Sequence, residues 1–282
     1  MKTVLLPSGR RVAALGQGTW NIGEDPAARA AEVAALQLGI DLGLTLIDSA
    51  EMYADGGAEQ VVGEAIVGRR DEVFIVSKVY PYNAGRQDMQ DACERSLRRL
   101  GVEQIDLYLL HWRGAIPLEE TLDGFMRLRE QGKIGAYGVS NFDLDDMLEA
   151  RALPGGEGIE CNQVLYNLAK RAIEWDLLPW CRQHALPVMA YSPLESSGSE
   201  RARFLANPAL QAVAARHACS AAQVALAWVL REEGVIAIPK AATLAHVREN
   251  RAALDLVLSA QDLAQLDAAF APPRRKHALA MR

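Results

Sequence analysis

Eight short β-rich runs alternate with helical runs along this chain, and this alternation constrains the fold more than any other feature. The runs follow one another about every 30 residues, the length of one strand–helix unit, with a longer interval before the last. Most runs are continuously apolar, as in parallel strands that are covered on both faces. In order, they are VAALGQG, LTLIDSA, VFIVSKV, IDLYLLHW, IGAYGVSN, IECNQVLYN, PVMAYSPL and VIAIPKA.

The segments between these runs have the apolar spacing of amphipathic helices. Clear examples cover residues 27–43, 86–101 and 118–133, and Gly132 is a stop signal for the third of them. Eight alternations in 282 residues fit a (β/α)8 TIM barrel better than an open sheet. The sequence therefore predicts an α/β fold with a closed parallel barrel.

Two segments lie outside the repeating units. Residues 3–12 contain a Pro-Ser-Gly turn and predict an N-terminal β-hairpin. Residues 243–254 and 259–270 predict extra C-terminal helices, with Ser259 as the N-cap of the second. No low-complexity linker or break in composition interrupts the chain, so residues 1–282 are expected to form a single domain.

Charge and cysteine content exclude several classes of protein. Lys and Arg total 30 against 36 Asp and Glu, a net charge of −6, so no basic face for nucleic acid is expected. No long apolar run predicts a membrane helix, and the first residues lack the apolar core of a signal peptide. The 4 cysteines are scattered, as is usual for buried thiols in a reducing compartment. We therefore expect a cytoplasmic protein.

Polar residues collect where the predicted strands end. In a (β/α)8 barrel the carboxyl ends of the strands meet at one mouth, where catalytic groups lie. A single lysine or histidine at a strand end is more often structural, but several titratable types at one mouth favour chemistry. These residues are Asp48, Tyr53, Lys78, His111, Ser140, Asn141, Gln163, Tyr191, Ser192 and Lys240.

The types of these side chains narrow the chemistry. Carboxylates and histidines are too few for a metal site, so no metal is expected. Lys78 alone would allow a Schiff-base aldolase, which stays open as an alternative. A lysine beside a tyrosine lowers the pKa of the phenol, so Tyr53 could protonate an alkoxide near neutral pH, with Asp48 paired to the lysine. An alkoxide forms when hydride is delivered to a carbonyl.

A nicotinamide cofactor has two candidate sites in the sequence. The stretch from Gly16 to Asn21 nearly matches G-x-G-x-x-G, but Asn21 replaces the third glycine, so a Rossmann site is not supported. In IPKAATLAHVREN, Lys240 precedes a helix start, whose free N–H groups favour phosphate. His246 and Arg248 add positive charge there, although an ordinary solvated helix start is an equal alternative.

An ordered set of motifs resembles the aldo-keto reductase family along nearly the whole chain. The resemblance is greatest to a bacterial branch that includes methylglyoxal-reducing enzymes. It implies a (β/α)8 barrel that uses NADPH more often than NADH and needs no metal. The motifs are GQGTW (16–20), DSAEMYADGGAEQVVGEA (48–65), SK (77–78), LLHW (109–112), GVSNF (138–142), NQVLYN (162–167), AYSPL (190–194), IPKA (238–241) and REN (248–250).

The resemblance also implies roles for the residues at the barrel mouth. Tyr53 would be the general acid, and Lys78 would lower its pKa. Asp48 would pair with Lys78, and His111 would orient the substrate carbonyl. The residues that would wall the substrate pocket are Trp20 and Trp112.

The implied cofactor site extends along the same mouth. Tyr191 would stack under the nicotinamide, and Ser140, Asn141 and Gln163 would hold its carboxamide. Residues 192–198 would form a loop over the pyrophosphate, and Thr243, Glu249 and Asn250 would line the adenosine end. The full set is Thr19, Trp20, Ser140, Asn141, Gln163, Tyr191, Ser192, Leu194, Lys240, Thr243, His246, Glu249 and Asn250.

Two positions depart from the family's NADP-preferring members. These members commonly carry Ser after the lysine of IPK and Arg six residues beyond it, where this chain has Ala241 and His246. A neutral histidine is a weaker partner of the 2′-phosphate than arginine, and its charge changes at about pH 6.5. Because Lys240 remains, NADPH is the expected cofactor and NADH the alternative. Affinity for NADPH is then expected to fall as the pH rises through the titration of His246.

The C-terminal tail after Phe270 is short, Pro-rich and basic. In the family this region helps to set specificity, so a short tail predicts an open pocket for small carbonyl substrates such as aldehydes and α-dicarbonyls. Relatives of the fold also serve as nucleotide-sensing subunits, which leaves a cofactor-binding sensor with little turnover as an alternative function. A monomer is the expected assembly.

Overall fold

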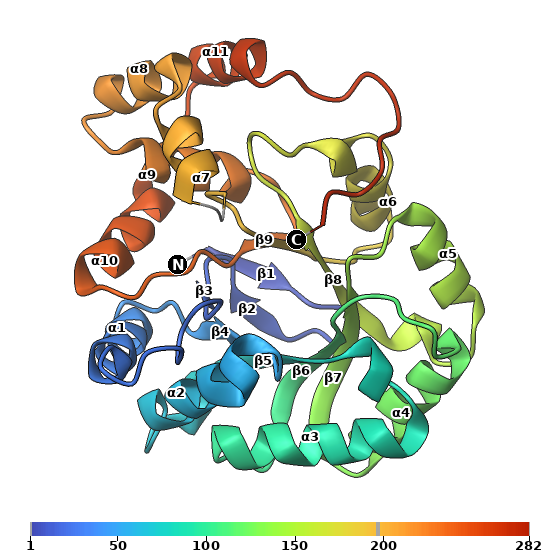
Figure 1. Cartoon of the computed structure of the whole chain (residues 1–282). Coiled ribbons are helices and arrows are strands. Elements are labelled where there is room, and N and C mark those ends of the chain that lie inside the picture. Colours follow the sequence, from blue (N-terminus) through green and yellow to red (C-terminus); the bar gives the residue numbers. More distant parts are fainter. Residues whose placement is uncertain (1, 196–197, 282) are drawn as a thin grey trace.

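The computed structural model describes residues 2–195 and 198–281 and confirms the predicted (β/α)8 barrel (Figure 1). Its sheet holds eight parallel strands in sequential order, from β3 to β10. Bridges from Leu15 to Ala237 and from Gly18 to Lys240 join the first strand to the last and close the barrel. The strands are β1 Thr3–Leu5, β2 Arg11–Ala13, β3 Gln17–Gly18, β4 Leu46–Asp48, β5 Phe74–Val79, β6 Ile105–Leu110, β7 Ile134–Ser140, β8 Ile159–Leu165, β9 Val188–Tyr191 and β10 Val235–Ala237.

Helices surround the barrel on its outer face (Figure 1). The α-helices are α1 Arg29–Asp41, α2 Gly57–Ala65, α3 Arg86–Leu100, α4 Leu118–Glu130, α5 Leu144–Ala152, α6 Leu177–Gln183, α7 Gly198–Leu205, α8 Pro208–Arg216, α9 Ala221–Leu230, α10 Leu244–Ala252 and α11 Ala260–Ala269. Short 3-10 helices are η1 Tyr53–Gly56, η2 Arg70–Glu72, η3 Pro81–Asn83, η4 Gly156–Gly158, η5 Ala172–Glu174 and η6 Ala253–Asp255.

Burial on both faces of the sheet explains the continuous apolar runs. Every residue of β5 and β6 is buried, because one face fills the barrel and the other packs against helices. On α4, Leu122, Phe125 and Leu128 are buried at the spacing expected for an amphipathic helix. Gly132, with φ of 72°, follows the end of α4, as its position in the sequence predicts.

The predicted N-terminal hairpin is confirmed, since β1 and β2 pair antiparallel. Ser8 Oγ donates to Glu160 Oε2 at 2.7 Å, and Arg10 Nη1 lies 2.6 Å from Asp106 Oδ1. Glu160 is the second residue of β8, and Asp106 is the second residue of β6. The hairpin therefore covers the end of the barrel where the strands begin, opposite the mouth.

The sequence-based prediction of one continuous strand over residues 12–18 is wrong. The first two residues of that run belong to β2 of the hairpin, and only Gln17–Gly18 forms a ladder with β4. The Ala14 N–H donates to the carbonyl of Lys2, whereas the Gly16 N–H donates to the carbonyl of Ala237. The chain thus passes from hairpin to barrel between residues 14 and 16, so one apolar run serves two sheets.

The C-terminal part holds more helices than the sequence predicts. Helices α10 and α11 confirm the predicted pair, and Ser259 caps α11 by accepting the N–H of Asp262. Helices α7 and α8 were not predicted; they lie with α9 in the long interval between β9 and β10. Among the described residues, no single helix is long and apolar enough to cross a membrane; α8 and α9 pass this test only together, bent by 89°.

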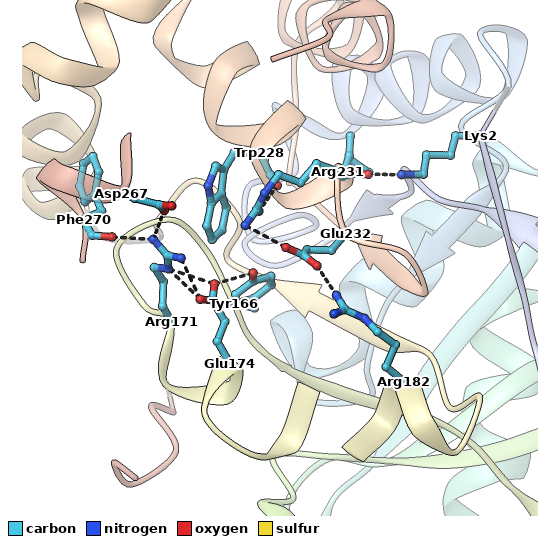
Figure 2. A network of polar contacts seen from close by, with 11 residues as sticks. Lys2, Tyr166, Arg171, Glu174, Arg182, Trp228, Arg231, Glu232, Asp267 and Phe270 are labelled. Atoms are coloured by element: carbon cyan, nitrogen blue, oxygen red, sulfur yellow. Dashed lines mark hydrogen bonds and ion pairs between the residues drawn. The ribbon is translucent and has the colours of Figure 1, made fainter. Parts of the chain in front are cut away.

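A network of polar contacts connects α9 and α11 to the loop that follows β8 (Figure 2). Arg171, in that loop, donates to Asp267 Oδ1 at 2.6 Å and to the carbonyl of Phe270 at 2.6 Å, at the end of α11. Two guanidinium groups lie over the ring of Trp228, which belongs to α9. The guanidinium of Arg171 is 4.9 Å from the ring centroid, and that of Arg231 is 3.9 Å from it. These cation–π contacts and hydrogen bonds hold α9 and α11 against the barrel.

Candidate active site

The carboxyl ends of the strands open into a cavity of about 600 Å³. The structure brings most of the predicted site residues together there. No group of three or more His, Cys, Asp or Glu side chains in residues 2–195 and 198–281 is placed to hold a metal ion. The predicted residues that line the cavity are Trp20, Asp48, Tyr53, His111, Ser140, Asn141, Gln163, Tyr191, Ser192, Leu194 and Lys240.

The backbone around this cavity is strained. Four non-glycine residues that line it have positive φ, at 59° for Asn21, 61° for Asn141, 49° for Ser192 and 62° for Glu195. The left-handed region is unfavourable for residues with a Cβ, although asparagine tolerates it better than most. Such conformations cluster at functional sites, where the surrounding structure holds them. The strain therefore supports this cavity as the functional site.

Lys78 forms the centre of a buried polar group beside the cavity. Its Nζ donates to Asp48 Oδ2 at 2.8 Å, to the carbonyl of Ser49 at 2.7 Å and to Tyr53 Oη at 3.2 Å. Gln163 Nε2 donates to the other oxygen of the carboxylate, Asp48 Oδ1, at 2.7 Å. Lys78 is fully buried and Asp48 almost fully, and the hydrogen bonds on both sides compensate for the burial of the two charges.

The pKa of Tyr53 moves in the direction opposite to the expectation from sequence. Burial raises the pKa of the phenol and outweighs Lys78, whose charge and hydrogen bond lower it, while Asp48 adds to the rise. The predicted lowering is therefore wrong, because a buried phenolate loses its hydration. For Lys78, burial lowers the pKa of the amine, but Asp48 and Tyr53 raise it by more. At neutral pH the phenol keeps its proton and the amine is charged.

His111 follows β6 and faces the same phenol. Its ring stands nearly edge-on to that of Tyr53, with the centroids 5.8 Å apart. Burial, assisted by the charge of Lys78, lowers the pKa of His111 to about 2, so the ring is neutral. Its Nδ1 is buried and has no hydrogen-bond partner in the part of the chain that the structure describes. A neutral imidazole has one N–H and one acceptor nitrogen, so it can bind a polar group of a substrate.

A chain of hydrogen bonds orders one wall of the cavity. Tyr191 Oη donates to Asn141 Oδ1 at 2.8 Å, and Asn141 Nδ2 donates to the carbonyl of His111 at 3.0 Å. Ser140 Oγ donates to the carbonyl of Gln163 at 2.8 Å. These bonds fix the half-buried ring of Tyr191 beside amide and hydroxyl groups. An aromatic face next to such groups suits a planar ring that carries an amide.

Seven predicted residues do not line the cavity. Thr19 Oγ1 donates to the carbonyl of Asp48 at 2.9 Å and so supports the end of β4. Thr243 caps α10 by accepting the N–H of His246, and both are exposed at the start of that helix. Residues 196–197 of the predicted pyrophosphate loop lie outside the described residues. The seven are Thr19, Lys78, Trp112, Thr243, His246, Glu249 and Asn250.

Several lining residues were not predicted as site residues, among them Asn21, Met52 and Arg201. Asn21 stands where a Rossmann motif would have its third glycine, and asparagine tolerates the left-handed conformation that it adopts better than most residues do. Arg201 lies on α7, and no local pattern shows that this helix faces the mouth. Together with Lys240 it gives the cavity two positive side chains.

Comparison with known sequences decides the family. The sequence model described as the aldo/keto reductase family matches residues 14–271. The chain belongs to the aldo/keto reductase family. It is 58% identical over 268 residues to methylglyoxal reductase YeaE of Escherichia coli (strain K12), covering 95% of this chain and 94% of that one. It is also 32% identical over 302 residues to the NADH-specific methylglyoxal reductase of the same strain, covering 88% and 91%.

Solved structures agree with this assignment to the aldo/keto reductases. The crystal structure of an aldo-keto reductase from Klebsiella pneumoniae in complex with NADPH matches this chain with a TM-score of 0.97 and 54% identity. The match covers 100% of this chain and 99% of that one. The family resemblance drawn from the ordered motifs is therefore confirmed, and the chain is an oxidoreductase with a (β/α)8 barrel.

Proposed function

We propose that this chain catalyses the NADPH-dependent reduction of aldehydes and ketones to alcohols, with small aldehydes and α-dicarbonyls such as methylglyoxal as substrates. The observation that carries the proposal is the hydrogen-bonded group of Tyr53, Lys78 and Asp48 beside the cavity at the barrel mouth. The substrate class is supported by 58% identity to a methylglyoxal reductase.

The residues of the cavity fit a nicotinamide cofactor. Tyr191 offers an aromatic face beside Ser140 and Asn141, and Lys240 and Arg201 offer positive charge for phosphates. When bound, the reduced nicotinamide supplies hydride to the carbonyl carbon. NADPH rather than NADH is supported by the Klebsiella pneumoniae protein, which was crystallised in complex with NADPH.

The side chains of this chain act on the carbonyl oxygen. His111 is neutral, so its ring N–H donates a hydrogen bond that orients the carbonyl. Tyr53 transfers the proton on Oη to that oxygen as negative charge develops on it. The ammonium of Lys78, 3.2 Å away, stabilises the phenolate that remains, and Asp48 keeps that ammonium charged.

Aromatic rings surround the two groups that meet the carbonyl. Trp20 stands edge-on to Tyr53 with the ring centroids 5.0 Å apart. Trp112 lies against His111 at 4.8 Å between centroids, and Tyr80 packs edge-on against Trp112. These rings keep water away from the phenol and imidazole, which strengthens their hydrogen bonds to a substrate.

Two alternative functions have less support. A Schiff base on Lys78 requires a neutral amine, whereas its raised pKa keeps it protonated. A protein that only senses the cofactor does not require the buried phenol of Tyr53 beside the ammonium of Lys78. Trapping with borohydride in the presence of a carbonyl compound separates the first alternative, because only a Schiff base leaves a covalent adduct.

Turnover assays test the proposal. We expect rapid consumption of NADPH with methylglyoxal and with simple aldehydes, slower consumption of NADH, and an alcohol as the product. Tyr53→Phe should lose this turnover. The matched control, Tyr82→Phe, removes the hydroxyl of an exposed tyrosine and should behave as the wild type. Tight binding of NADPH without turnover on a broad carbonyl panel would overturn the proposal in favour of a sensor.

We also propose that residues 1–282 act as one domain and as a cytoplasmic monomer. A single large apolar core that extends from Val4 in the hairpin to Leu266 in α11 supports one domain. Light scattering should give the mass of one chain, 30.7 kDa, and fractionation should place the protein with cytoplasmic markers. A mass of twice that value would contradict the monomer.

A further inference from the structure

The chain turns sharply directly after Tyr53, and the turn is strained. Ala54 (φ 51°, ψ 41°) and Asp55 (φ 50°, ψ 40°) are both left-handed, and Gly56 follows with φ of 87°. A residue with a Cβ avoids this region, and two in succession persist only where the surrounding structure imposes the conformation. The residues packed against this turn therefore control where Tyr53 lies.

The side chain of Arg99, from α3, packs against the turn. A Cβ on Gly56 would lie 2.3 Å from Arg99 Nε, so the guanidinium side chain fills the space beside this glycine. The same Nε donates to Glu59 Oε2 at 2.6 Å, and Glu59 lies in the first turn of α2. Arg99 thus touches the turn at its last residue and also holds the helix that follows.

Glu59 extends this connection to the strand that carries Lys78. Its side chain is fully buried, and its second oxygen, Oε1, accepts from Ser77 Oγ at 2.5 Å. Ser77 and Lys78 are neighbours on β5, so their side chains point to opposite faces of the sheet. Ser77 reaches outward to Glu59, and Lys78 reaches inward to Tyr53. Glu59 is therefore connected to Lys78 through Ser77. Through Arg99 it is connected to the turn that follows Tyr53.

We propose that Arg99 and Glu59 are positioning residues that set the distance between Tyr53 Oη and Lys78 Nζ. The inference rests on the proposed function, in which Tyr53 is the proton donor. Without this pair the strained turn relaxes toward right-handed conformations and the phenol moves away from the ammonium. A displacement of about 1 Å is enough to cost on the order of a hundredfold in rate.

Arg99→Met tests the proposal, and Asp106→Asn is its matched control. Asp106 is also a buried carboxylate that joins an arginine to β5, because it accepts from Arg70 Nη2 and from the Ile75 N–H, both at 2.8 Å. It lies at the opposite end of the barrel from the mouth. Both variants break an ion pair between a partly exposed arginine and a buried carboxylate and should lower the melting temperature, but only Arg99→Met should affect the proton donor.

For Arg99→Met we expect kcat to fall by about tenfold or more, while the dissociation constant of NADPH changes by less than about twofold. The alkaline limb of the kcat profile should move to higher pH, because a phenol farther from Lys78 has a higher pKa. Arg99→Lys should restore part of kcat. A merely structural role would lower the folded fraction without moving the pH profile.

Ser77→Ala keeps the test decisive if Arg99→Met does not fold. It removes one hydrogen bond to Glu59 and leaves the ion pair, and we expect kcat to fall by about threefold with the same shift of the pH profile. Unchanged kcat and pH profile in the folded variants would overturn the proposal, as would an equal loss of kcat in Asp106→Asn. Tyr53→Phe in the same panel separates the two claims: if it is inactive while Arg99→Met is normal, only the positioning role fails.

Discussion

The Nζ atom of Lys78 lies 3.2 Å from the Oη atom of Tyr53, and both side chains are buried. Burial alone favours the neutral forms of both groups. The ammonium survives because the carboxylate of Asp48 lies 2.8 Å from it. In the proposed function, the phenol gives its proton to the carbonyl oxygen of the substrate, and the ammonium then stabilises the phenolate that remains. We therefore expect proton donation to depend on the contact between Lys78 and Tyr53.

Lys78→Met should remove the carbonyl reductase activity. The phenolate would form without a positive charge beside it, so kcat is expected to fall by at least about a hundredfold, the usual size of general acid catalysis. Stability should fall too, by about 3 kcal/mol, because Asp48 would stay buried without its cation. Steady-state kinetics and denaturant unfolding measure the two effects.

A double variant separates these two effects of Lys78. Lys78→Met with Asp48→Asn removes both buried charges, so the free energy of unfolding should recover in part. The activity should stay lost, because no ammonium faces Tyr53. Recovery of both stability and activity would show that the charge on Lys78 has no part in proton transfer.

His111 should make folding sensitive to acid. In the unfolded chain the imidazole takes up a proton below about pH 6.5, whereas burial lowers the pKa of the folded group to about 2. The unfolded state therefore binds more protons between these values, and stability falls as the pH falls through this window. Between pH 6 and pH 4 the free energy of unfolding should fall by about 2.5 kcal/mol more in the wild type than in His111→Gln. Denaturant unfolding at both pH values measures this, and equal losses in the two proteins would contradict a buried neutral histidine.

Ala54→Gly should stabilise the protein although it removes a methyl group. Glycine adopts the left-handed conformation without the steric cost that alanine carries, so the gain is about 1 kcal/mol. The control is Ala34→Gly, at an exposed position within α1, which should lose about 1 kcal/mol of helix stability. A loss of stability in both variants would show that the turn after Tyr53 is not strained.

The barrel could be predicted from sequence because its strands are buried on both faces and so leave continuous apolar runs. The runs around Lys78 and His111 also end in the polar residues of the mouth, so the sequence predicted that these side chains lie near one another. The run over residues 12–18 misled the prediction, because its first residues pair with the hairpin. Apolar character does not show which of two sheets a residue joins.

Other features depend on tertiary distances that a sequence pattern does not contain. The predicted lowering of the pKa of Tyr53 considered its charged neighbour Lys78, but the depth of burial decides the direction. Arg201 reaches the cavity only because α7 packs at the mouth, and the link from Arg99 to Glu59 spans two helices. Neither Arg99 nor Arg201 lies in one of the motifs that identify the family.

His246→Arg should strengthen the preference for NADPH. His246 is exposed at the start of α10, close in sequence to Lys240, and an arginine there could pair with the 2′-phosphate. Affinity for NADPH should rise by about tenfold, since hydrogen bonds between charged groups contribute about 1.5 kcal/mol, while affinity for NADH should not change. Ala245→Arg adds the same charge one residue away and is the control. An equal rise in both variants would reveal only a general effect of charge.

The most direct test of the account is Tyr53→Phe, measured for NADPH binding and for reduction of methylglyoxal in the same preparation. The substitution removes only the phenol oxygen, so the dissociation constant of NADPH should stay within about twofold of the wild type, and kcat should fall by at least about a hundredfold. If the variant keeps more than about a tenth of the wild-type kcat, a loss below about 1.4 kcal/mol, Tyr53 is not the proton donor.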